Sequence, residues 1–370
     1  MIKAHRHAPV MRRSARVYLN DLNTGKVETL TGFLHQCHDI TQYFVDLFWQ
    51  RQDFSSTLSD LETVHKGRDK FNITTRLAQA MAKQAKETVK SAHERVGHKP
   101  QLHNHTTTLY SHFVKVETFT GSFDFAVTLT GSGAPRMVIP VHSTKVINNR
   151  LADGWQIGKT IRLGLRRGRI FIDFILEKPR PAKRESGVIV GMDSNYKNGL
   201  VFSDGQSTGN EVYQRIQAFS KRQKHTHVEV KSLIRHSLKG IDFSNIRMLC
   251  IESLKSVKSG TRGKFPRKFN RRLSHWLYAS TVDWIKQKCE ETGTRLVEKN
   301  PAHTSQFCSI CGKWDKRNRV GDRFKCVHCG FSNHADLNAA QNLALLGEAG
   351  VYGLRSLPNL NLCSQNQRFG

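Results

Sequence analysis

The sequence is short of acidic residues and has no long apolar stretch. Its 370 residues include 30 Asp and Glu against 58 Lys and Arg, which leaves a net charge of +28. Such an excess of one sign destabilises a compact chain by self-repulsion and is typical of proteins that bind a polyanion. Nucleic acid is the first candidate for this polyanion. An anionic membrane surface is the alternative, although neither terminus carries an isolated basic amphipathic helix.

Two further absences narrow the class of protein. The chain has no run of 18 apolar residues, so no segment is expected to span a bilayer. The first residues, MIKAHRHAPVMRRSARV, lack the apolar core of a signal peptide, so we expect an intracellular protein. Hydrophobic residues make up 38% and charged residues 24%, which describes a globular chain of about two or three domains.

Cysteines are few, but four of the eight are paired in sequence. Cys308 and Cys311 form one Cys-x₂-Cys unit, and Cys326 and Cys329 form a second, with 14 residues between the two. This spacing is typical of a tetrahedral thiolate Zn²⁺ site, whereas a redox Cys-x₂-Cys would need only one pair. Four thiolates leave no open position, so the sequence predicts one structural zinc ion.

The hydrophobic pattern changes along the chain. A strand near residues 15–19 precedes a helical pattern from Thr31 to about Gly97. Five short strands then follow between about Leu109 and Pro179, and their spacing favours a small barrel. From Gly187 the pattern is mixed α/β, in the order of a ribonuclease-H-like fold. We therefore expect a multidomain α+β protein.

Three acidic residues stand out in the α/β part. Asp193 and Glu252 each end an apolar strand-like run, and Asp336 opens a helix after the second cysteine pair. Each alone has an ordinary interpretation: Asp193 as a turn cap, Glu252 as a surface residue, and Asp336 as a helix N-cap. As a set, they are typical of phosphodiester hydrolysis by two cations about 3.5–4 Å apart, which need carboxylates converging from several elements. Mg²⁺ prefers such oxygen ligands.

Basic residues gather in two places that a phosphate backbone could follow. A turn carries Arg166 and Arg167, and the segment 258–272 interleaves basic residues with Gly, Phe265 and Phe269. A solvated flexible loop is the alternative for this segment, but its start just after Glu252 favours a place beside the acids. The candidate nucleic-acid-binding residues are Arg166, Arg167, Lys264, Arg267, Lys268, Arg271 and Arg272.

These motifs together resemble TnpB, the transposon-associated RNA-guided endonuclease family, and its relatives among the small type V CRISPR effectors. The resemblance is carried by GMDSNYKNGLVFSDG, IESL, HTSQFCSICG and FKCVHCGFSNHADLNAAQNLA, which lie between about Val188 and Gly347. It implies an OB-like wedge β-barrel with an inserted helical recognition lobe, then a RuvC-like nuclease domain with an inserted zinc ribbon. The implied limits are 1–30 and 108–180 for the barrel, 31–107 for the lobe, 181–305 and 331–350 for the nuclease domain, 306–330 for the ribbon and 351–370 for a flexible tail.

The resemblance also implies site residues and partners. Asp193, Glu252 and Asp336 would be the catalytic acids and hold two Mg²⁺ ions, and the four paired cysteines would hold the zinc. The family binds a guide RNA from its own transposon end and cuts double-stranded target DNA beside a short flanking motif. We expect a monomer or dimer in a prokaryotic cytoplasm, associated with the nucleoid. The alternatives are a guided repressor that does not cut and an unguided ribonuclease-H-like nuclease.

One departure from the family pattern lies beside the first acid. The family commonly has Gly or another small residue two positions after that Asp, whereas this chain has Asn195. Asn tolerates tight-turn dihedrals, so the turn itself is compatible with the change.

Overall fold

The protein is described by a computed structural model over residues 9–354, apart from 56, 58, 59, 96, 120, 196–198, 210, 213, 215–225 and 254–277. The chain divides after Pro179 into two compact units, Met1–Pro179 and Arg180–Gly370. The tail expected at 351–370 lies outside the described residues from 355 onward. The sequence also predicts a basic helix from Glu211 to about Leu238, and residues 213 and 215–225 of it lie outside the described residues.

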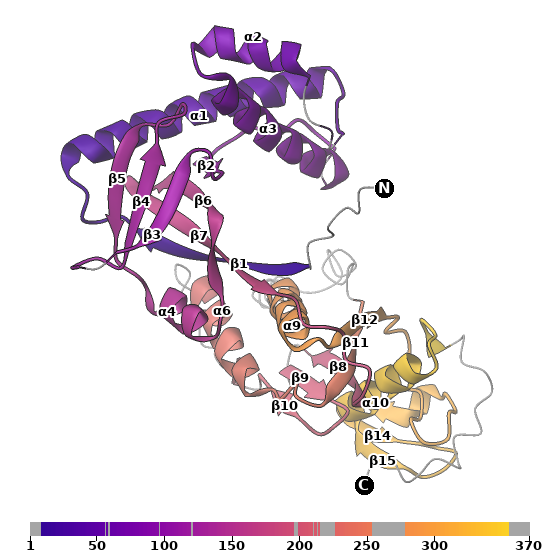
Figure 1. Ribbon diagram of the computed structural model, residues 1–370. Helices are drawn as coiled ribbons and strands as arrows, with labels where there is room; N and C mark the ends of the chain where they lie inside the picture. Colours follow the sequence, from indigo (N-terminus) through magenta and orange to yellow (C-terminus); the bar gives the residue numbers. More distant parts are fainter. Residues whose placement is uncertain are drawn as a thin grey trace, which may run out of the picture. The chain divides into compact units, whose positions relative to one another are not determined.

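Two antiparallel sheets form the strand part of the first unit (Figure 1). The strands are β1 (Val10–Tyr18), β2 (His105–Leu109), β3 (Val114–Thr118), β4 (Phe125–Thr130), β5 (Arg136–Val141), β6 (Gln156–Arg166) and β7 (Arg169–Pro179). One sheet has the order β1-β7-β6-β2 and the other β3-β4-β5. The expected barrel is therefore divided, because no strand pairing among the described residues joins the two sheets. A turn in which Phe113 N donates to Tyr110 O redirects the chain between β2 and β3.

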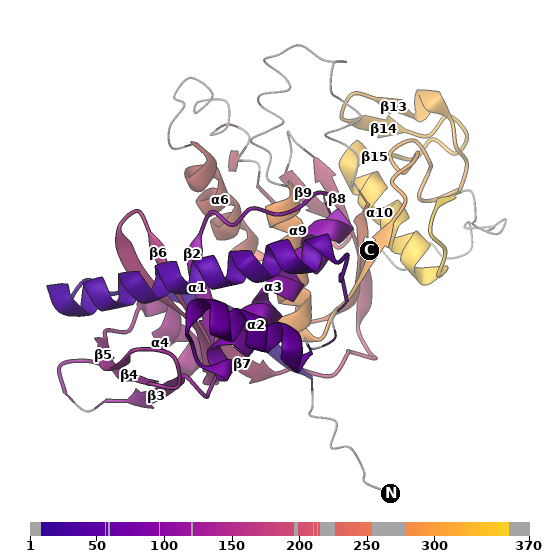
Figure 2. The same ribbon diagram turned by 90° about the horizontal axis from the view of Figure 1, so that it is seen from above.

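Helices complete the first unit (Figures 1 and 2). They are α1 (Thr24–Gln50), α2 (Leu61–Phe71), α3 (Thr75–Arg95) and α4 (Lys145–Ala152). The expected start of the helical part at Thr31 was too late, because Asn23 Oδ1 accepts from Lys26 N at 2.9 Å and caps α1 there. The sequence analysis also missed α4, which is short and mostly polar and has Ile147 as its buried residue.

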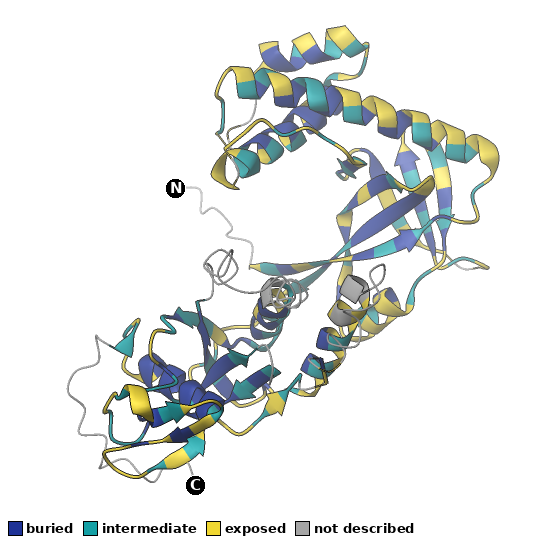
Figure 3. Ribbon diagram, turned by 180° about the vertical axis from the view of Figure 1, so that it is seen from behind, coloured by how far each residue is buried: buried dark blue, intermediate teal, exposed yellow. Residues whose placement is uncertain are grey.

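The core of this unit lies between the helices and the sheets. Buried side chains recur every three or four residues along α1, which is the spacing of one helix face, and Figure 3 shows this face as a dark stripe. They are Leu30, Phe33, Leu34, Cys37, Ile40, Thr41, Phe44, Val45 and Phe48. Each large apolar side chain removed from water contributes about 1.5–3 kcal/mol. The unit therefore has a hydrophobic core of its own.

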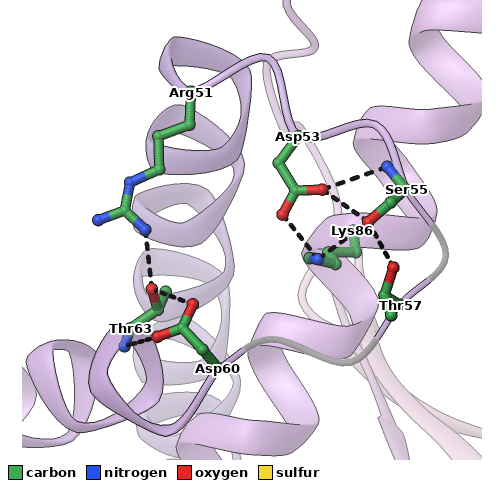
Figure 4. Close-up of polar contacts among 7 residues, drawn as sticks. All are labelled: Arg51, Asp53, Ser55, Thr57, Asp60, Thr63 and Lys86. Carbon is green, nitrogen blue, oxygen red and sulfur yellow. Dashed lines mark hydrogen bonds and ion pairs between the residues drawn. The ribbon is translucent and has the colours of Figure 1, made fainter.

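The segment between α1 and α2 is held by polar contacts (Figure 4). Lys86 of α3 has a side chain only 7% exposed, and its Nζ lies 2.7 Å from Asp53 Oδ2. Asp60 caps α2, since its carboxylate accepts from Thr63 N at 2.7 Å and from Thr63 Oγ1 at 2.9 Å. A buried ammonium group is costly without a partner, so the Asp53 pair ties this segment to α3.

The second unit contains a five-stranded mixed sheet and a small three-stranded sheet. The strands are β8 (Val188–Asn195), β9 (Gly199–Phe202), β10 (Ser207–Thr208), β11 (Ile246–Glu252) and β12 (Arg295–Lys299), then β13 (Arg319–Val320), β14 (Arg323–Lys325) and β15 (Ser332–His334). The first sheet has the order β10-β9-β8-β11-β12, with β11 parallel to both β8 and β12 and with β9 antiparallel to β8. The apolar runs GVIVGMDS and GLVFSDG predict a hairpin, which β8 and β9 form, and the α+β class is confirmed.

The helices of the second unit are α6 (Thr226–Ser237), α9 (Tyr278–Thr292) and α10 (Ala335–Glu348), with two 3₁₀ turns, η1 (Leu238–Gly240) and η2 (Lys316–Asn318). The C-terminal end of α9 is followed by Gly293 at φ 74°, the left-handed conformation that favours Gly after a helix. The sequence likewise predicts that this helix ends at Gly293. The predicted start of this helix before Tyr278 falls outside the described residues.

Helix α10 packs unusually close to β8 because Gly191 has no side chain. A Cβ atom at Gly191 would lie 1.9 Å from Ala340 O and 2.6 Å from Ala344 N, both backbone atoms of α10. Gly347 near the other end of the helix has a similar role, since its Cβ would lie 2.3 Å from Cys250 Sγ. These contacts fix α10 against the strands that carry two of the acids.

Candidate metal centres

Asp193 and Glu252 lie side by side at one edge of the sheet. Met192 of β8 is opposite Ile251 of β11, and the two strands run parallel, so the next residue of each strand reaches the same edge. Asp193 and Glu252 are each 8% exposed, and their carboxyl groups share a hydrogen bond. Glu252 is therefore not a surface residue.

Asp336 joins this pair from the amino-terminal end of α10. It is 2% exposed, and its charge acts on both Asp193 and Glu252. It is not the N-cap of the helix, because His334 occupies that position and its Nδ1 accepts from Asp336 N at 3.3 Å. The carboxylate is therefore available to the centre, where the packing of α10 on Gly191 places it.

The close approach of the buried acids raises the pKa of two of them. Burial and then the Asp336 carboxylate raise the pKa of Asp193 to about 7, although the hydrogen bond with Glu252 and the charge of Arg319 act in the opposite direction. Burial and then Asp193 raise the pKa of Glu252 well above its ordinary value. Both shifts arise because carboxylate charges are desolvated close to one another. A bound cation would relieve them.

Two more side chains reach the acids, and the sequence analysis assigned neither of them to the centre. Asn195 Nδ2 donates to both carboxylate oxygens of Asp336, at 3.0 and 3.1 Å. Arg319, the first residue of β13, contributes positive charge at Asp193 and Glu252. Its approach depends on how the small sheet docks onto the larger one, so no motif in the sequence signals it.

This carboxylate centre fits hard divalent cations. Three carboxylates from β8, β11 and α10 supply the oxygen ligands that Mg²⁺ prefers, and a bound cation would favour the charged forms that burial disfavours. Carboxylates gathered in this way can hold the cations used in phosphoryl transfer.

The four paired cysteines converge as well. Their sulfur atoms all lie within 4.8 Å of one another, with Cys308 Sγ to Cys329 Sγ at 3.7 Å and Cys311 Sγ to Cys326 Sγ at 3.6 Å. Four sulfurs at about 2.3 Å from a tetrahedral Zn²⁺ ion are separated by about 3.8 Å. The cluster therefore has the dimensions of a zinc site.

Backbone geometry around the cysteines supports the same conclusion. Gly312 N donates to Cys308 O and Gly330 N to Cys326 O, and both glycines have positive φ, 68° and 76°. Burial raises the pKa of the Cys326 thiol, but N–H groups of Cys329 and His328 more than offset burial and bring this pKa to about 7. This favours thiolate, the form that binds metal, at Cys326, whereas burial raises the pKa of the Cys308 and Cys311 thiols.

Asparagines connect the cysteine segment to α10. Asn338 Nδ2 donates to Phe307 O at 2.8 Å, and Asn338 Oδ1 accepts from Ser309 N at 3.2 Å. Asn342 Nδ2 donates to Thr304 O and to Phe307 O, each at 2.7 Å. Hydrogen bonds thus join the helix that carries Asp336 to the backbone beside the first Cys-x₂-Cys unit.

The candidate nucleic-acid-binding residues are only partly described. Arg166 and Arg167 are exposed at the β6–β7 hairpin, where Arg167 and Gly168 both have positive φ, 51° and 72°, as in a type I′ turn. Lys264, Arg267, Lys268, Arg271 and Arg272 lie outside the described residues. Among the described helices, none is long and apolar enough to cross a bilayer.

The first unit also has a groove of about 870 Å³ along α3. Basic and polar side chains line much of it, with Lys83 Nζ over the Tyr110 ring at 4.7 Å from its centre. Its basic lining residues are Arg76, Lys83, Lys86, Lys90 and His112.

A match to a protein-family model lies in the second unit. The Cas12f1-like TNB domain family matches residues 278–343. Cas12f1, a CRISPR-associated endodeoxyribonuclease of Sulfoacidibacillus thermotolerans, is 43% identical over 77 residues, or 20% of this chain and 18% of the relative. The TnpB-like protein MJ0751 of Methanocaldococcus jannaschii is 30% identical over 134 residues, or 35% of this chain and 45% of the relative. The putative RNA-guided DNA endonuclease InsQ of Escherichia coli is 40% identical over 58 residues, or 15% and 14%.

A solved structure resembles the chain over a greater length. The cryo-EM structure of a Cas12f1–sgRNA–target DNA complex matches with a TM-score of 0.52 and 15% identity, over 87% of this chain and 83% of the other. At this identity the match shows the fold. The chain spans less than a fifth of the first curated relatives it matches. The TNB match and the TnpB-like relatives show that part of this chain is similar to proteins of the TnpB lineage, and the solved structure shows that the fold is shared.

Proposed function

We propose that the protein is an RNA-guided DNA endonuclease that cuts target DNA beside a short flanking motif. The observation that carries the proposal is the meeting of Asp193, Glu252 and Asp336, three buried acids from three elements, at one edge of the sheet. Relatives named as RNA-guided or CRISPR-associated endonucleases support the same chemistry.

The three acids would act as ligands for two Mg²⁺ ions. Such ions, when bound, stabilise charge on the attacking and leaving oxygens of a phosphodiester. Asp193 and Glu252 supply carboxylates from neighbouring strands, and Asp336 closes the set from α10. Arg319 adds a positive charge beside the first two acids, where it suits the phosphate oxygens of a bound strand.

Cys308, Cys311, Cys326 and Cys329 would hold one structural zinc ion. Four thiolates fill a tetrahedral site, so no position is left for a substrate. The asparagine contacts with α10 give this ion a second effect, because the fold of the ribbon then supports the helix that carries Asp336.

The basic surface would hold a guide RNA from the transposon end and double-stranded target DNA. Arg166, Arg167 and the groove along α3 are the described parts of this surface. Lys264, Arg267, Lys268, Arg271 and Arg272 remain proposed contacts, and so do the monomeric or dimeric state and the association with a prokaryotic nucleoid. Base pairing would read the sequence and the protein would read duplex shape and the flanking motif.

Cleavage of a matched plasmid tests the proposal. The purified protein, Mg²⁺ and the transposon-end RNA should linearise a plasmid that carries the complementary target, and a plasmid with a scrambled target should stay intact. Asp193→Ala should abolish cutting and keep RNA binding within about twofold, since a ligand is lost and not the fold. Sequencing the RNA that co-purifies with the protein would supply the guide.

Two other outcomes would contradict the proposal. Tight binding of the matched target without any cut would indicate a guided repressor. Cutting of both plasmids in the absence of RNA would indicate an unguided ribonuclease-H-like nuclease.

A further inference from the structure

We infer that Asn195 is a positioning residue of the carboxylate centre and that its side-chain amide orients Asp336 for cation binding. The inference rests on the proposed function. It concerns the position at which this chain departs from the small residue that is common in the family.

The register of β8 places Asn195 beside the centre. Side chains alternate along a strand, so Asn195 points to the same face as Asp193, two residues before it, while Ser194 points to the other. The amide reaches across to α10, where Asn195 Nδ2 lies 3.0 Å from Asp336 Oδ1 and 3.1 Å from Asp336 Oδ2. The last residue of the strand that carries one acid therefore holds another acid of the centre.

The contact matters because it opposes the repulsion between Asp336 and the other two acids. Its carboxylate is 2% exposed and lies near two other acids, so like-charge repulsion favours its rotation away from them. A donor at both oxygens opposes this rotation and fixes the plane of the carboxylate. Hydrogen bonds of this kind to metal ligands typically change metal affinity by about 10–100-fold.

A glycine at this position could not supply the contact, because it has no side chain to donate to the Asp336 oxygens. His334 approaches Asp336 Oδ2 only at 3.8 Å. The surroundings of Asn195 are in part apolar, since Leu200, Val212 and Leu238 line the same small pocket. A leucine of similar size is therefore expected to fit while the donor is removed.

Direct measurement of cation binding tests the role without relying on cleavage. Free Mn²⁺ would be followed by electron paramagnetic resonance as it is titrated into wild type, Asn195→Leu, Asn195→Gln and Ser194→Ala. Asp193→Asn serves as the blank that identifies binding at the acids. We expect Asn195→Leu to weaken this binding by about 10-fold or more. Ser194→Ala should bind like wild type, and Asn195→Gln should lie between Asn195→Leu and wild type because it keeps the amide.

The outcomes separate the two proposals. If Asn195→Leu binds Mn²⁺ as tightly as wild type, or if Asn195→Gln binds no better than Asn195→Leu, the role of the amide is wrong while the proposed function stands. If Asp193→Asn binds as much Mn²⁺ as wild type, the acids are not a metal centre, and the proposed function fails together with the inference.

Discussion

At the scale of single residues, the carboxylate centre gathers acids whose charged forms are disfavoured by burial and by one another. Asp193 and Glu252 are buried against each other, and Asp336 adds a third negative group. Arg319 and the Asn195 amide compensate part of this charge. The remainder has a measurable thermodynamic effect, because a buried acid with a raised pKa makes stability depend on pH.

We expect Asp193→Asn to stabilise the protein near pH 8 when no magnesium is added. The folded protein raises the Asp193 pKa from 3.8 to about 7, so it holds a proton that the unfolded chain has released. Wild-type stability therefore falls as pH rises through this window, and the variant avoids this loss of about 1–3 kcal/mol. The advantage should vanish near pH 4. Urea unfolding at the two pH values measures it.

Magnesium provides the control for this prediction. Saturating Mg²⁺ should reverse the order of stability, because wild type gains binding free energy that the variant lacks. An Asp193→Asn variant that is no more stable than wild type near pH 8 without magnesium would contradict the prediction.

The three acids could be predicted from the sequence, whereas the side chains that contact them, Arg319 and Asn195, could not. Asp193 and Glu252 interrupt apolar runs, which is a local signal, and parallel strands bring such residues to one edge. Arg319 gives no local signal, because its approach depends on the docking of two sheets. The Asn195 contact with Asp336 joins residues that are far apart in the sequence, and the turn chemistry of Asn could not indicate it.

At the scale of elements, α10 links the carboxylate centre and the cysteine cluster. Its amino-terminal end carries Asp336, its middle packs on Gly191, and Asn338 and Asn342 bind the backbone near Cys308. Nearly all of its residues are buried, as the dark helix in Figure 3 shows. A displacement of α10 therefore affects the acids and the cysteines together.

Gly191→Ala should displace α10 and impair the carboxylate centre. The new Cβ would meet backbone atoms of Ala340 and Ala344, which cannot rotate away as a side chain could. We expect a loss of about 1–3 kcal/mol in the free energy of unfolding and weaker Mn²⁺ binding. Gly240→Ala is the matched control, since nothing lies within 4 Å of its added Cβ. Equal stability of the two variants would show that the helix adjusts freely.

Cys308→Ser should release zinc and loosen the ribbon. The sulfur lies 3.7 Å from Cys329 Sγ in a cluster sized for tetrahedral coordination, and a small metal site loses most of its affinity when one thiolate is removed. Metal analysis should fall from about one zinc per chain to near none. Cys37→Ala, in the first unit, should keep the zinc. Unchanged zinc content in Cys308→Ser would refute the assignment of the ligands.

Helices and strands were predicted well where the sequence has a clear run or periodic pattern of apolar residues. The buried strands β8 and β11 and the capped helix α9 agree with the sequence. The start of α1 was misplaced because the turn that follows its N-cap, Asn23, is mostly polar. The helix α4 was missed because it is short. The division of the expected barrel depends on strand pairing, which a single sequence does not encode locally.

At the scale of the whole molecule, the net charge of +28 dominates. The charge is spread over both units, and the described basic positions include the hairpin with Arg166 and Arg167 and the groove along α3. Binding of a polyanion to such a surface releases condensed counter-ions, so its affinity depends steeply on salt.

We expect RNA affinity to fall by about 10³-fold or more between about 50 and 200 mM salt, as for a protein that makes six or more phosphate contacts. Arg166→Ala should reduce the slope of log affinity against log salt by about one, because one contact is lost. Arg317→Ala is the control, since its guanidinium is paired with Asp315 at 2.8 Å. Filter binding over a salt series measures both. A slope unaffected by Arg166→Ala would remove the hairpin from the interface.

The position of Asp336 within the chain has a consequence for synthesis. Residues 193 and 252 emerge from the ribosome well before α10, which supplies the remaining carboxylate and closes the edge of the sheet. A nascent chain that stalls before this helix lacks both the third carboxylate and the helix that packs on β8. If the proposed function holds, products truncated before this helix should be unable to cut DNA, because their set of acids is incomplete.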